Sequence, residues 1–409
     1  TPERTEPETP PERVANAEPV QPSRTIRLPR RLQKIRDDVD GVTERLLKVN
    51  NAVDSDHGID FEIDENDRAV AVRIHNASVR NIAPLAALTP LRSFLYEPWG
   101  GNGQLRDLDA LGEIPLVSIH VEACRVDNIS CLRGLRLKRA GFPTTKIREL
   151  RPLRSMPLEA LDIRGTSVID LSPLANLPLK QLDVSDTSVR SLVSLRSLPL
   201  THLSAAGVPA RDFTWLGHLK LQHLNLSRTS LDSLGDLSGM PLKTLLAART
   251  EVTDLGPLKG LPLDRLDVSG CPIEHFDALG GLPLRDLNLS DTPFRDAAIL
   301  KGMKVHRLDL SGTKVADLSP LDGMPLRVLR IANTPVRDIA PIAHDKLTTL
   351  DCRGTSIGDY RSLKGAGIQR LDIDDPEKHF EFIASLPKLR FINGEDLATL
   401  RNRAIRNLD

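Results

Sequence analysis

The feature that most constrains this chain is a leucine that recurs every 21 residues. The column comprises Leu161, Leu182, Leu203, Leu224, Leu245, Leu266, Leu287, Leu308, Leu329, Leu350 and Leu371. The register continues upstream, less regularly, through Ala140, Ile119, Phe94 and Val72, with an insertion within residues 97–103. A fixed period of this length indicates repeated units that each contact only their neighbours. The chain is therefore expected to form an open stack of about fifteen coils.

Each unit reads P-L-x-x-L-x-[ILV]-x-x-T-x-V-x-D-L-x-P-L-x-x-[LM]. The L-x-[ILV] part alternates with period two, which predicts a short strand with one buried face. The D-L-x-P-L part predicts an Asx-capped turn or 3-10 segment, because proline prevents a longer helix. Only 3% of the residues are aromatic, so leucine must fill the core. We expect an α/β leucine-rich-repeat solenoid, a shallow right-handed arc with a parallel β-sheet inside and turns outside.

Four segments are expected along the chain. Residues 1–31 are rich in Pro, Glu and Arg and predict a disordered linker. Residues 32–71 predict an N-terminal helix and a capping hairpin, residues 72–373 the array of about fifteen coils, and residues 374–409 a C-terminal cap. The basic run Arg24 to Arg36 is interpreted as a solvated segment, with contact to anionic lipid or RNA as the alternative.

Threonine recurs where each predicted strand ends, for example at Thr250, Thr292 and Thr313. Its hydroxyl is expected to bond backbone groups that the coil leaves unpaired, so this column is interpreted as structural. Cys124 and Cys271 occupy the same place in two coils. They are seven coils apart, too far for a disulfide, and the cysteines therefore do not assign a redox compartment.

The chain resembles the C-terminal leucine-rich-repeat modules of planctomycete-type bacterial serine/threonine protein kinases. The resemblance covers about residues 40–400, and its unit is the 21-residue, internalin-like one. It rests on the DLSPL and LPL coils, on VNNAVDSDHGIDFEIDENDRAVAVRIHNASVRNIAPLAALTPLRSF and on DPEKHFEFIASLPKLRFINGEDLATL. It implies a recognition or sensor part of a larger bacterial signalling protein. Kinase chemistry is not implied, because the chain lacks the Gly-rich phosphate loop and the H-R-D and D-F-G motifs.

A polar row is expected on the inner face, between the two buried residues of each strand. Its acids and amides are Asp162, Asp183, Asn225, Asp267, Asn288, Asp309, Asp351 and Asp372. The position two residues earlier holds His202, His223, Arg265 and Arg307. Exposed polar rows on a solenoid's inner face are typical of partner binding, so we predict a protein or peptide partner, with the acids favouring a basic one. The alternative is a mixed charge lattice without a partner.

Two other kinds of site were weighed against this one. Asp162 with Asp183, and Asp351 with Asp372, have the spacing of retaining glycosidases, but a sugar site also needs aromatic platforms. His202 and His223 could hold a metal with Asp183, although exposed imidazoles are more often bystanders. We therefore predict no catalytic residue, metal or cofactor, and keep an inner-face enzyme or a purely architectural spacer as alternatives. Trp99, on the insertion, is interpreted as a contact residue or a packing residue.

Charge and hydropathy bound the remaining classes. Lys plus Arg (55) equals Asp plus Glu (55), so no nucleic-acid partner is expected. The sequence has no run of about 18 apolar residues, and no membrane span is expected within it. It begins at Thr1 without a leader, which favours a fragment or a processed product. The location, cytoplasmic or tethered outside through an upstream membrane segment, and the oligomeric state are left open.

Overall fold

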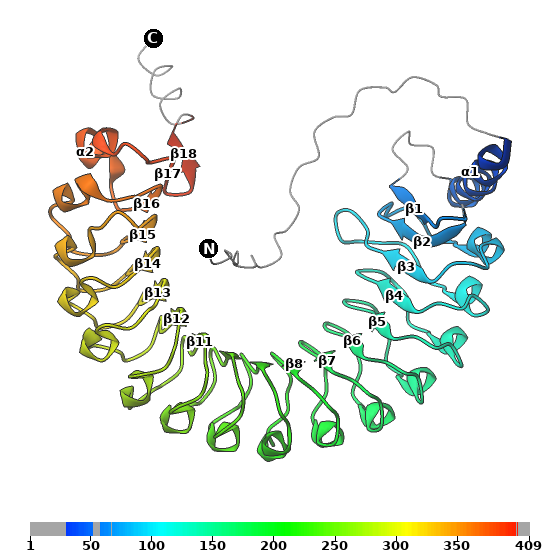
Figure 1. Cartoon of the computed structure of the whole chain (residues 1–409), viewed down its shortest axis with the longest axis horizontal. Helices are drawn as coiled ribbons and strands as arrows, with labels where there is room; N and C mark the ends of the chain where they lie inside the picture. Colours follow the sequence, from blue (N-terminus) through cyan, green and yellow to red (C-terminus); the bar gives the residue numbers. More distant parts are fainter. Residues whose placement is uncertain (1–29, 52–57, 67, 398, 400–409) are drawn as a thin grey trace, which may run out of the picture.

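The structure is a computed structural model that describes residues 30–51, 58–66, 68–397 and 399. The described chain forms an open horseshoe with one continuous sheet on its concave side and a row of 3-10 turns on its convex side (Figure 1). The predicted leucine-rich-repeat solenoid is confirmed. Of the linker predicted over residues 1–31, only Arg30 and Arg31 belong to the described residues. Residues 400–409 of the predicted C-terminal cap also lie outside the described residues.

The helices are α1 (Arg30–Asn50) and α2 (Phe380–Ser385). The strands are β1 (Ile59–Ile63), β2 (Ala69–Ile74), β3 (Ser93–Tyr96), β4 (Ser118–Val121), β5 (Arg139–Gly141), β6 (Ala160–Asp162), β7 (Gln181–Asp183), β8 (His202–Ser204), β9 (His223–Asn225), β10 (Thr244–Leu246), β11 (Arg265–Asp267), β12 (Asp286–Asn288), β13 (Arg307–Asp309), β14 (Val328–Arg330), β15 (Thr349–Asp351), β16 (Arg370–Asp372), β17 (Phe391–Ile392) and β18 (Glu395–Asp396).

Strands β2 to β17 pair in parallel and in chain order, in the register of the leucine column. Val72 pairs with Phe94 at one end and Leu371 with Ile392 at the other. Two antiparallel hairpins flank this ladder, β1 with β2 and β17 with β18. Such end pieces protect the exposed edges of a stacked array, which would otherwise pair with other chains.

The core is one continuous stack of apolar side chains between the sheet and the convex turns. Leu266 in β11 and Leu258 in the preceding turn are fully buried. The horseshoe bends more than the shallow arc that the sequence suggested, because each coil is wider at its 3-10 turn than at its strand (Figure 1). The bend makes the inner face of the sheet concave while leaving it open at both sides (Figure 1).

A single buried asparagine joins the N-terminal helix to the first coil. The side chain of Asn50 donates to the carbonyls of Leu46 (2.7 Å) and Asn81 (2.8 Å). Its oxygen accepts from the backbone N–H groups of Arg80 (2.6 Å) and Asn81 (2.8 Å). Val42 and Leu46 add apolar contact, since both are buried. The side chain thus satisfies backbone groups on both elements at once.

The threonine column has the structural role that its position predicts. The buried hydroxyls donate to the carbonyl three residues earlier, as in Thr250 to Ala247 (2.8 Å) and Thr292 to Leu289 (2.6 Å). Cys271, which replaces threonine in its coil, donates its thiol to the carbonyl of Ala247 (3.0 Å). Each threonine bond closes the corner of its own coil, where the chain leaves the sheet. The thiol bond of Cys271 instead links its coil to the preceding one.

Thr292→Val should lower the free energy of unfolding by about 1–3 kcal/mol, because it leaves a buried carbonyl without its hydroxyl partner. Thr292→Ser keeps the hydroxyl and should cost clearly less. Urea denaturation followed by circular dichroism measures both variants. Equal stability of the wild-type protein and the Thr292→Val variant would show that the column does not hold the corners.

Candidate functional site on the concave face

The Asp/Asn row lies at the ends of the concave strands, and most of it has a local structural role. In every rung of the row except that of Asp372, a side-chain oxygen accepts the backbone N–H two residues on, at 2.9–3.3 Å. This Asx bond ends the strand and turns the chain. Folding therefore selects short acids and amides here, and the composition of the row does not by itself indicate a partner.

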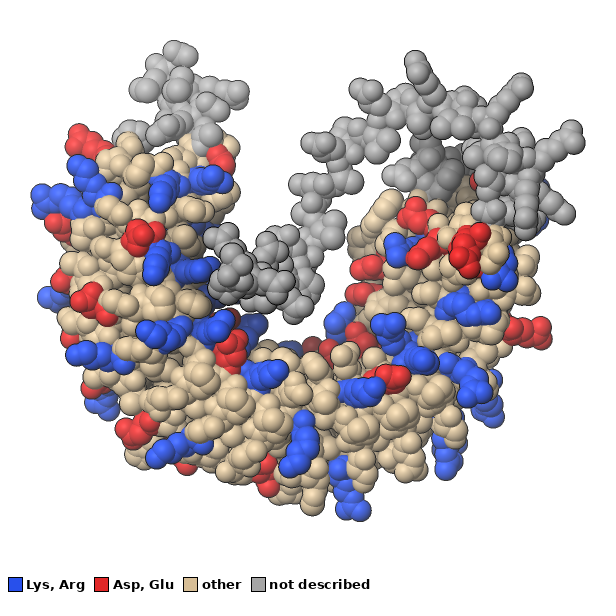
Figure 2. Space-filling view, viewed as in Figure 1, with Lys and Arg blue, Asp and Glu red and all other residues tan. Residues whose placement is uncertain are grey.

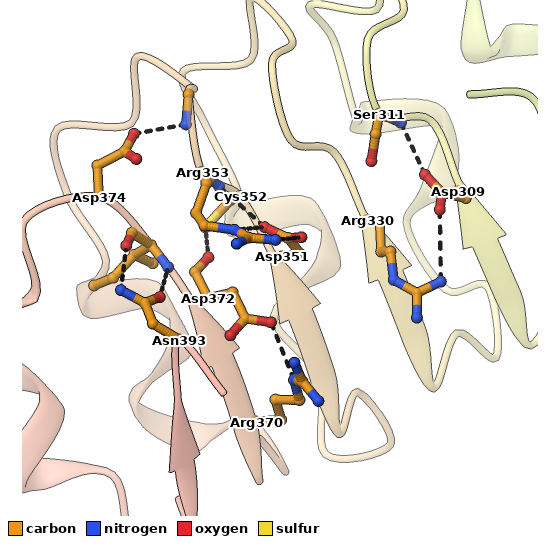
Figure 3. Close-up of polar contacts among 12 residues, drawn as sticks. Asp309, Ser311, Arg330, Asp351, Cys352, Arg353, Arg370, Asp372, Asp374 and Asn393 are labelled. Atoms are coloured by element: carbon orange, nitrogen blue, oxygen red, sulfur yellow. Dashed lines mark hydrogen bonds and ion pairs between the residues drawn. The ribbon is translucent and has the colours of Figure 1, made fainter. Parts of the chain in front are cut away.

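Two members of the row are buried, contrary to the expectation that the row faces solvent. Asp351 and Asp372 are 6% and 4% exposed. Arg353 holds Asp351 through two bonds of 2.9 and 2.6 Å, and the Nε of Arg370 bonds Asp372 at 3.1 Å (Figure 3). The arginine side chains cover the carboxylates, which the spacing of the acids alone did not reveal.

The C-terminal half of the concave face, from β11 to β16, is a lattice of alternating charge. Its hollow is lined by arginines and aspartates in equal number. Arg330 lies 3.5 Å from Asp309, and Arg265 lies 3.7 Å from Asp286, in addition to the pairs of Asp351 and Asp372. Arg307 makes no ion pair with the described residues. This half matches the mixed lattice that the sequence allowed, and its charges largely compensate one another.

The other half, from β4 to β10, forms a less charged hollow of about 470 Å³. Its lining includes small and aliphatic residues such as Ala140, Gly141 and Ala160, and no Phe, Tyr or Trp. A Cβ atom on Gly141 would lie 2.4 Å from Nδ1 of His120. Glycine therefore lets this imidazole lie across the next rung, where its Nε2 is 3.2 Å from Glu122.

Asp162 and Asp183 face this hollow from adjacent rungs that pair directly in the sheet. Burial raises the pKa of Asp162, while the backbone N–H and the guanidinium of Arg164 oppose that rise and Asp183 adds to it. The guanidinium is 3.5 Å away. Asp183 accepts the N–H of Ser185 and has no ion pair with the described residues. The pair therefore leaves negative charge in a partly buried position.

His202 and His223 lie beside these acids on β8 and β9. Their rings stack with centroids 4.3 Å apart and planes at 19°. Nδ1 of His202 contacts the hydroxyl of Thr201 (2.9 Å), and Nδ1 of His223 contacts that of Thr244 (3.0 Å). Burial lowers both pKa values, and His202 lowers that of His223 further. The lowered pKa values favour the neutral form of both rings, and neither Nε2 makes a hydrogen bond with the described residues.

The two alternative kinds of site gain no support from this geometry. Both carboxylates of the pair Asp351 and Asp372 are bonded to arginines, and neither concave hollow is lined by an aromatic platform. No group of three His, Cys, Asp or Glu side chains in the described part of the chain is placed to hold a metal ion.

Trp99 packs against its neighbours, and a contact role for it remains a prediction. Its ring stacks on His75 with centroids 5.6 Å apart and planes at 4°. A Cβ on Gly58 would lie 3.2 Å from the ring, so the tryptophan also packs against backbone. The residue is nevertheless 58% exposed. It lies outside both concave hollows.

Solved structures share this fold. An internalin (InlF) from Listeria monocytogenes is 22% identical, with a TM-score of 0.63, over 79% of this chain and 98% of that one. The Arabidopsis receptor kinase HAESA, in complex with the peptide hormone IDA and the co-receptor SERK1, is 16% identical, with a TM-score of 0.54, over 84% of this chain and 66% of that one.

The ectodomain of GASSHO1/SCHENGEN3 from Arabidopsis thaliana, in complex with CASPARIAN STRIP INTEGRITY FACTOR 2, is 16% identical, with a TM-score of 0.52, over 76% of this chain and 51% of that one. At these identities the likeness concerns the fold, which is that of leucine-rich-repeat solenoids. No protein-family model and no curated protein matches the chain in sequence. Within the described residues, no helix has the length and apolar character needed to cross a membrane.

Proposed function

We propose that this chain is a non-catalytic recognition module that binds an extended basic peptide, or such a segment of a protein, in the hollow over β4 to β10. The observation that carries the proposal is the half-buried pair Asp162 and Asp183 beside two neutral imidazoles in a concave, weakly charged surface. The complex of HAESA with the peptide hormone IDA supports it, and so does that of GASSHO1 with CASPARIAN STRIP INTEGRITY FACTOR 2, since both proteins have this fold.

The chemistry of the hollow favours a lysine or arginine in the bound segment. Arg139 is the one lysine or arginine that lines it, against two carboxylates. A cation from the partner would neutralise Asp183, which has no ion pair with the described residues. His223 could donate from Nε2 to a carbonyl of the segment when its Nδ1 accepts the Thr244 hydroxyl. The Thr201 hydroxyl already donates to the carbonyl of Lys180 (3.2 Å), so His202 donates from Nδ1 and keeps Nε2 as an acceptor for an N–H of the segment. The half of the concave face from β11 to β16 offers no comparable attraction for a cation, because its arginines and aspartates compensate one another.

A random peptide library displayed on phage and selected on the immobilised chain should enrich basic peptides. Asp183→Asn should lower the affinity for the enriched peptides at least about tenfold, as measured by fluorescence anisotropy. The negative charge is lost, while the amide oxygen still accepts the Ser185 N–H. The matched control is Asp267→Asn, the same change on β11 outside this hollow, which should change affinity less than about twofold.

Two results would count against the proposal. One is a selection that enriches no binding peptide at all, which favours the architectural spacer. The other is equal weakening by Asp183→Asn and Asp267→Asn with both folds intact, because binding would then not depend on this hollow. Enriched peptides without basic residues would overturn the choice of partner.

We further propose that the module is the sensor or scaffold part of a larger bacterial signalling protein. The resemblance of residues 40–400 to the modules of planctomycete-type kinases supports this context. The gene region upstream of the codon for Thr1 tests it. A kinase domain encoded in the same reading frame is the expected finding, and an in-frame start codon at that point would contradict it.

A further inference from the structure

The two sides of the horseshoe carry opposite charge, although the chain as a whole is neutral. One side consists of the segments that lead from each 3-10 turn, or from α2, into the next strand, from β3 to β17. These entry segments contain seventeen Lys or Arg and five Asp or Glu. The other side consists of the exit segments, which lead from each of the strands β2 to β16 to the turn that follows it. These exit segments contain fourteen Lys or Arg and nineteen Asp or Glu. The basic excess of the entry side is thus twelve charges.

Folding explains many acids of the exit side but not the bases of the entry side. Asp170, Asp254 and Asp338 each accept the N–H two residues on and so begin a 3-10 turn. The entry-side lysines and arginines are all exposed. Two of them make ion pairs within the described residues, Lys180 with Glu159 (2.9 Å) and Arg285 with Asp264 (3.4 Å). Most of the basic charge is therefore left uncompensated.

The positive potential acts on a neighbouring group. His306 lies in an entry segment, between the segments of Arg285 and Arg327. Partial burial lowers its pKa, and the two arginines lower it further, with Asp264 opposing them. Cations from the coils on both sides therefore act on one imidazole.

The entry segments form a broad, even surface because the strands are parallel and in register. Equivalent positions of successive coils lie side by side at the strand spacing of about 4.8 Å. Figure 2, viewed down the shortest axis of the molecule, shows that Lys and Arg side chains occur from one arm of the horseshoe to the other, with Asp and Glu side chains among them. Cations on neighbouring entry segments are therefore within about one Debye length, 8–10 Å, of one another and act together on a partner.

We infer that the entry side docks on an anionic lipid bilayer, with the concave hollow open at the edge of the contact. A flat anionic surface meets the basic side of the whole arc at once, whereas a straight polyanion such as duplex DNA follows only a few coils of a horseshoe. Clusters of lysine and arginine are attracted to anionic headgroups, and the acidic exit side then faces away from them. This inference does not depend on the proposed peptide site.

Vesicle co-sedimentation of the full chain tests the inference. The chain should bind vesicles of phosphatidylcholine with 30% phosphatidylglycerol, release them in 0.5 M NaCl, and not bind pure phosphatidylcholine. The entry-side variant combines Arg133→Glu, Arg136→Glu, Lys138→Glu, Lys301→Glu and Lys304→Glu. It should bind the anionic vesicles at least about tenfold more weakly, because five surface cations are reversed.

The matched control reverses five exposed exit-side arginines, by Arg148→Glu, Arg190→Glu, Arg211→Glu, Arg295→Glu and Arg337→Glu, and should keep most of the binding. Both variants retain the basic run from Arg24 to Arg36. If the entry-side variant still binds the anionic vesicles, that run is responsible for membrane binding and the inference is overturned. Equal loss in both variants with intact folds, no binding to anionic vesicles, or tighter binding to duplex DNA through the same side would overturn it as well. Peptide binding is read out separately, so the two proposals stand or fall independently.

Discussion

Leu266→Ala should lower the free energy of unfolding by about 2–5 kcal/mol, which makes it one of the most destabilising single changes in the chain. Leu266 is fully buried and pairs with Leu245 on one side and Leu287 on the other. Truncation opens a cavity shared by three coils, and a solenoid cannot close it without shifting a whole coil. Urea denaturation followed by circular dichroism measures the effect.

The neighbouring residue provides the control for this prediction. Asp267→Asn keeps an oxygen for the N–H of Ser269 and should change stability by less than about 0.5 kcal/mol. A wild-type denaturation curve for the Leu266→Ala variant, with a destabilised Asp267→Asn variant, would mean that the two faces of the strand are exchanged.

Arg353→Met should cost about 2–3 kcal/mol, because it leaves the buried carboxylate of Asp351 unpaired while keeping the arginine's apolar stem. The guanidinium itself is half exposed, so the cost falls below that of a fully buried pair. Asp372 and Asp374 act electrostatically on the same guanidinium, so its loss also leaves three neighbouring acids less compensated.

Arg361→Met is the matched change, since Arg361 also pairs with the aspartate two residues before it. The side chain of Asp359 is 56% exposed, whereas that of Asp351 is 9% exposed. The Arg361→Met variant should therefore denature close to the wild-type protein. Similar losses in the two variants would show that burial of Asp351 does not set the strength of its pair. Thermal denaturation of both variants decides between these results.

The period of the leucines predicted the fold because stacking is a local rule repeated in every coil. The same rule placed the strand register and the threonine bonds. The curvature was underestimated because it depends on the spacing between neighbouring 3-10 turns on the convex side. No single residue of the sequence determines that spacing. Asn50 was missed because most of its partners are backbone groups of residues 80 and 81 in the first coil, and no sequence pattern identifies such backbone partners.

The candidate site was less predictable than the fold. The sequence placed the Asp/Asn row on the concave face. It did not distinguish acids whose role is to end a strand from acids that are available to bind a partner. Asp351 and Asp372 were misjudged because Arg353 and Arg370, each two residues away in the same coil, bond their carboxylates. Gly141 interrupts the alternation of its strand, which is a signal for a close approach, and the imidazole of His120 makes that approach. The charge difference between the sides became visible once the strand ends were known.

The two halves of the concave face suggest different roles in one protein. From β11 onward, arginine and aspartate neutralise each other and stabilise the arm. From β4 to β10, small side chains leave a hollow whose acids and imidazoles retain unused bonding capacity. A peptide that binds there should therefore contact the first half and leave the second unchanged.

Nuclear magnetic resonance of the histidine rings tests this most directly, with the chain labelled at histidine and titrated with an enriched basic peptide. The signals of His202 and His223, assigned through His202→Gln and His223→Gln, should shift in proportion to the bound fraction. The signals of His218, on a convex turn, and His379, near α2, should remain in place. Shifts confined to His218 or His379, or bound peptide with no shift of His202 and His223, would contradict recognition in the concave hollow.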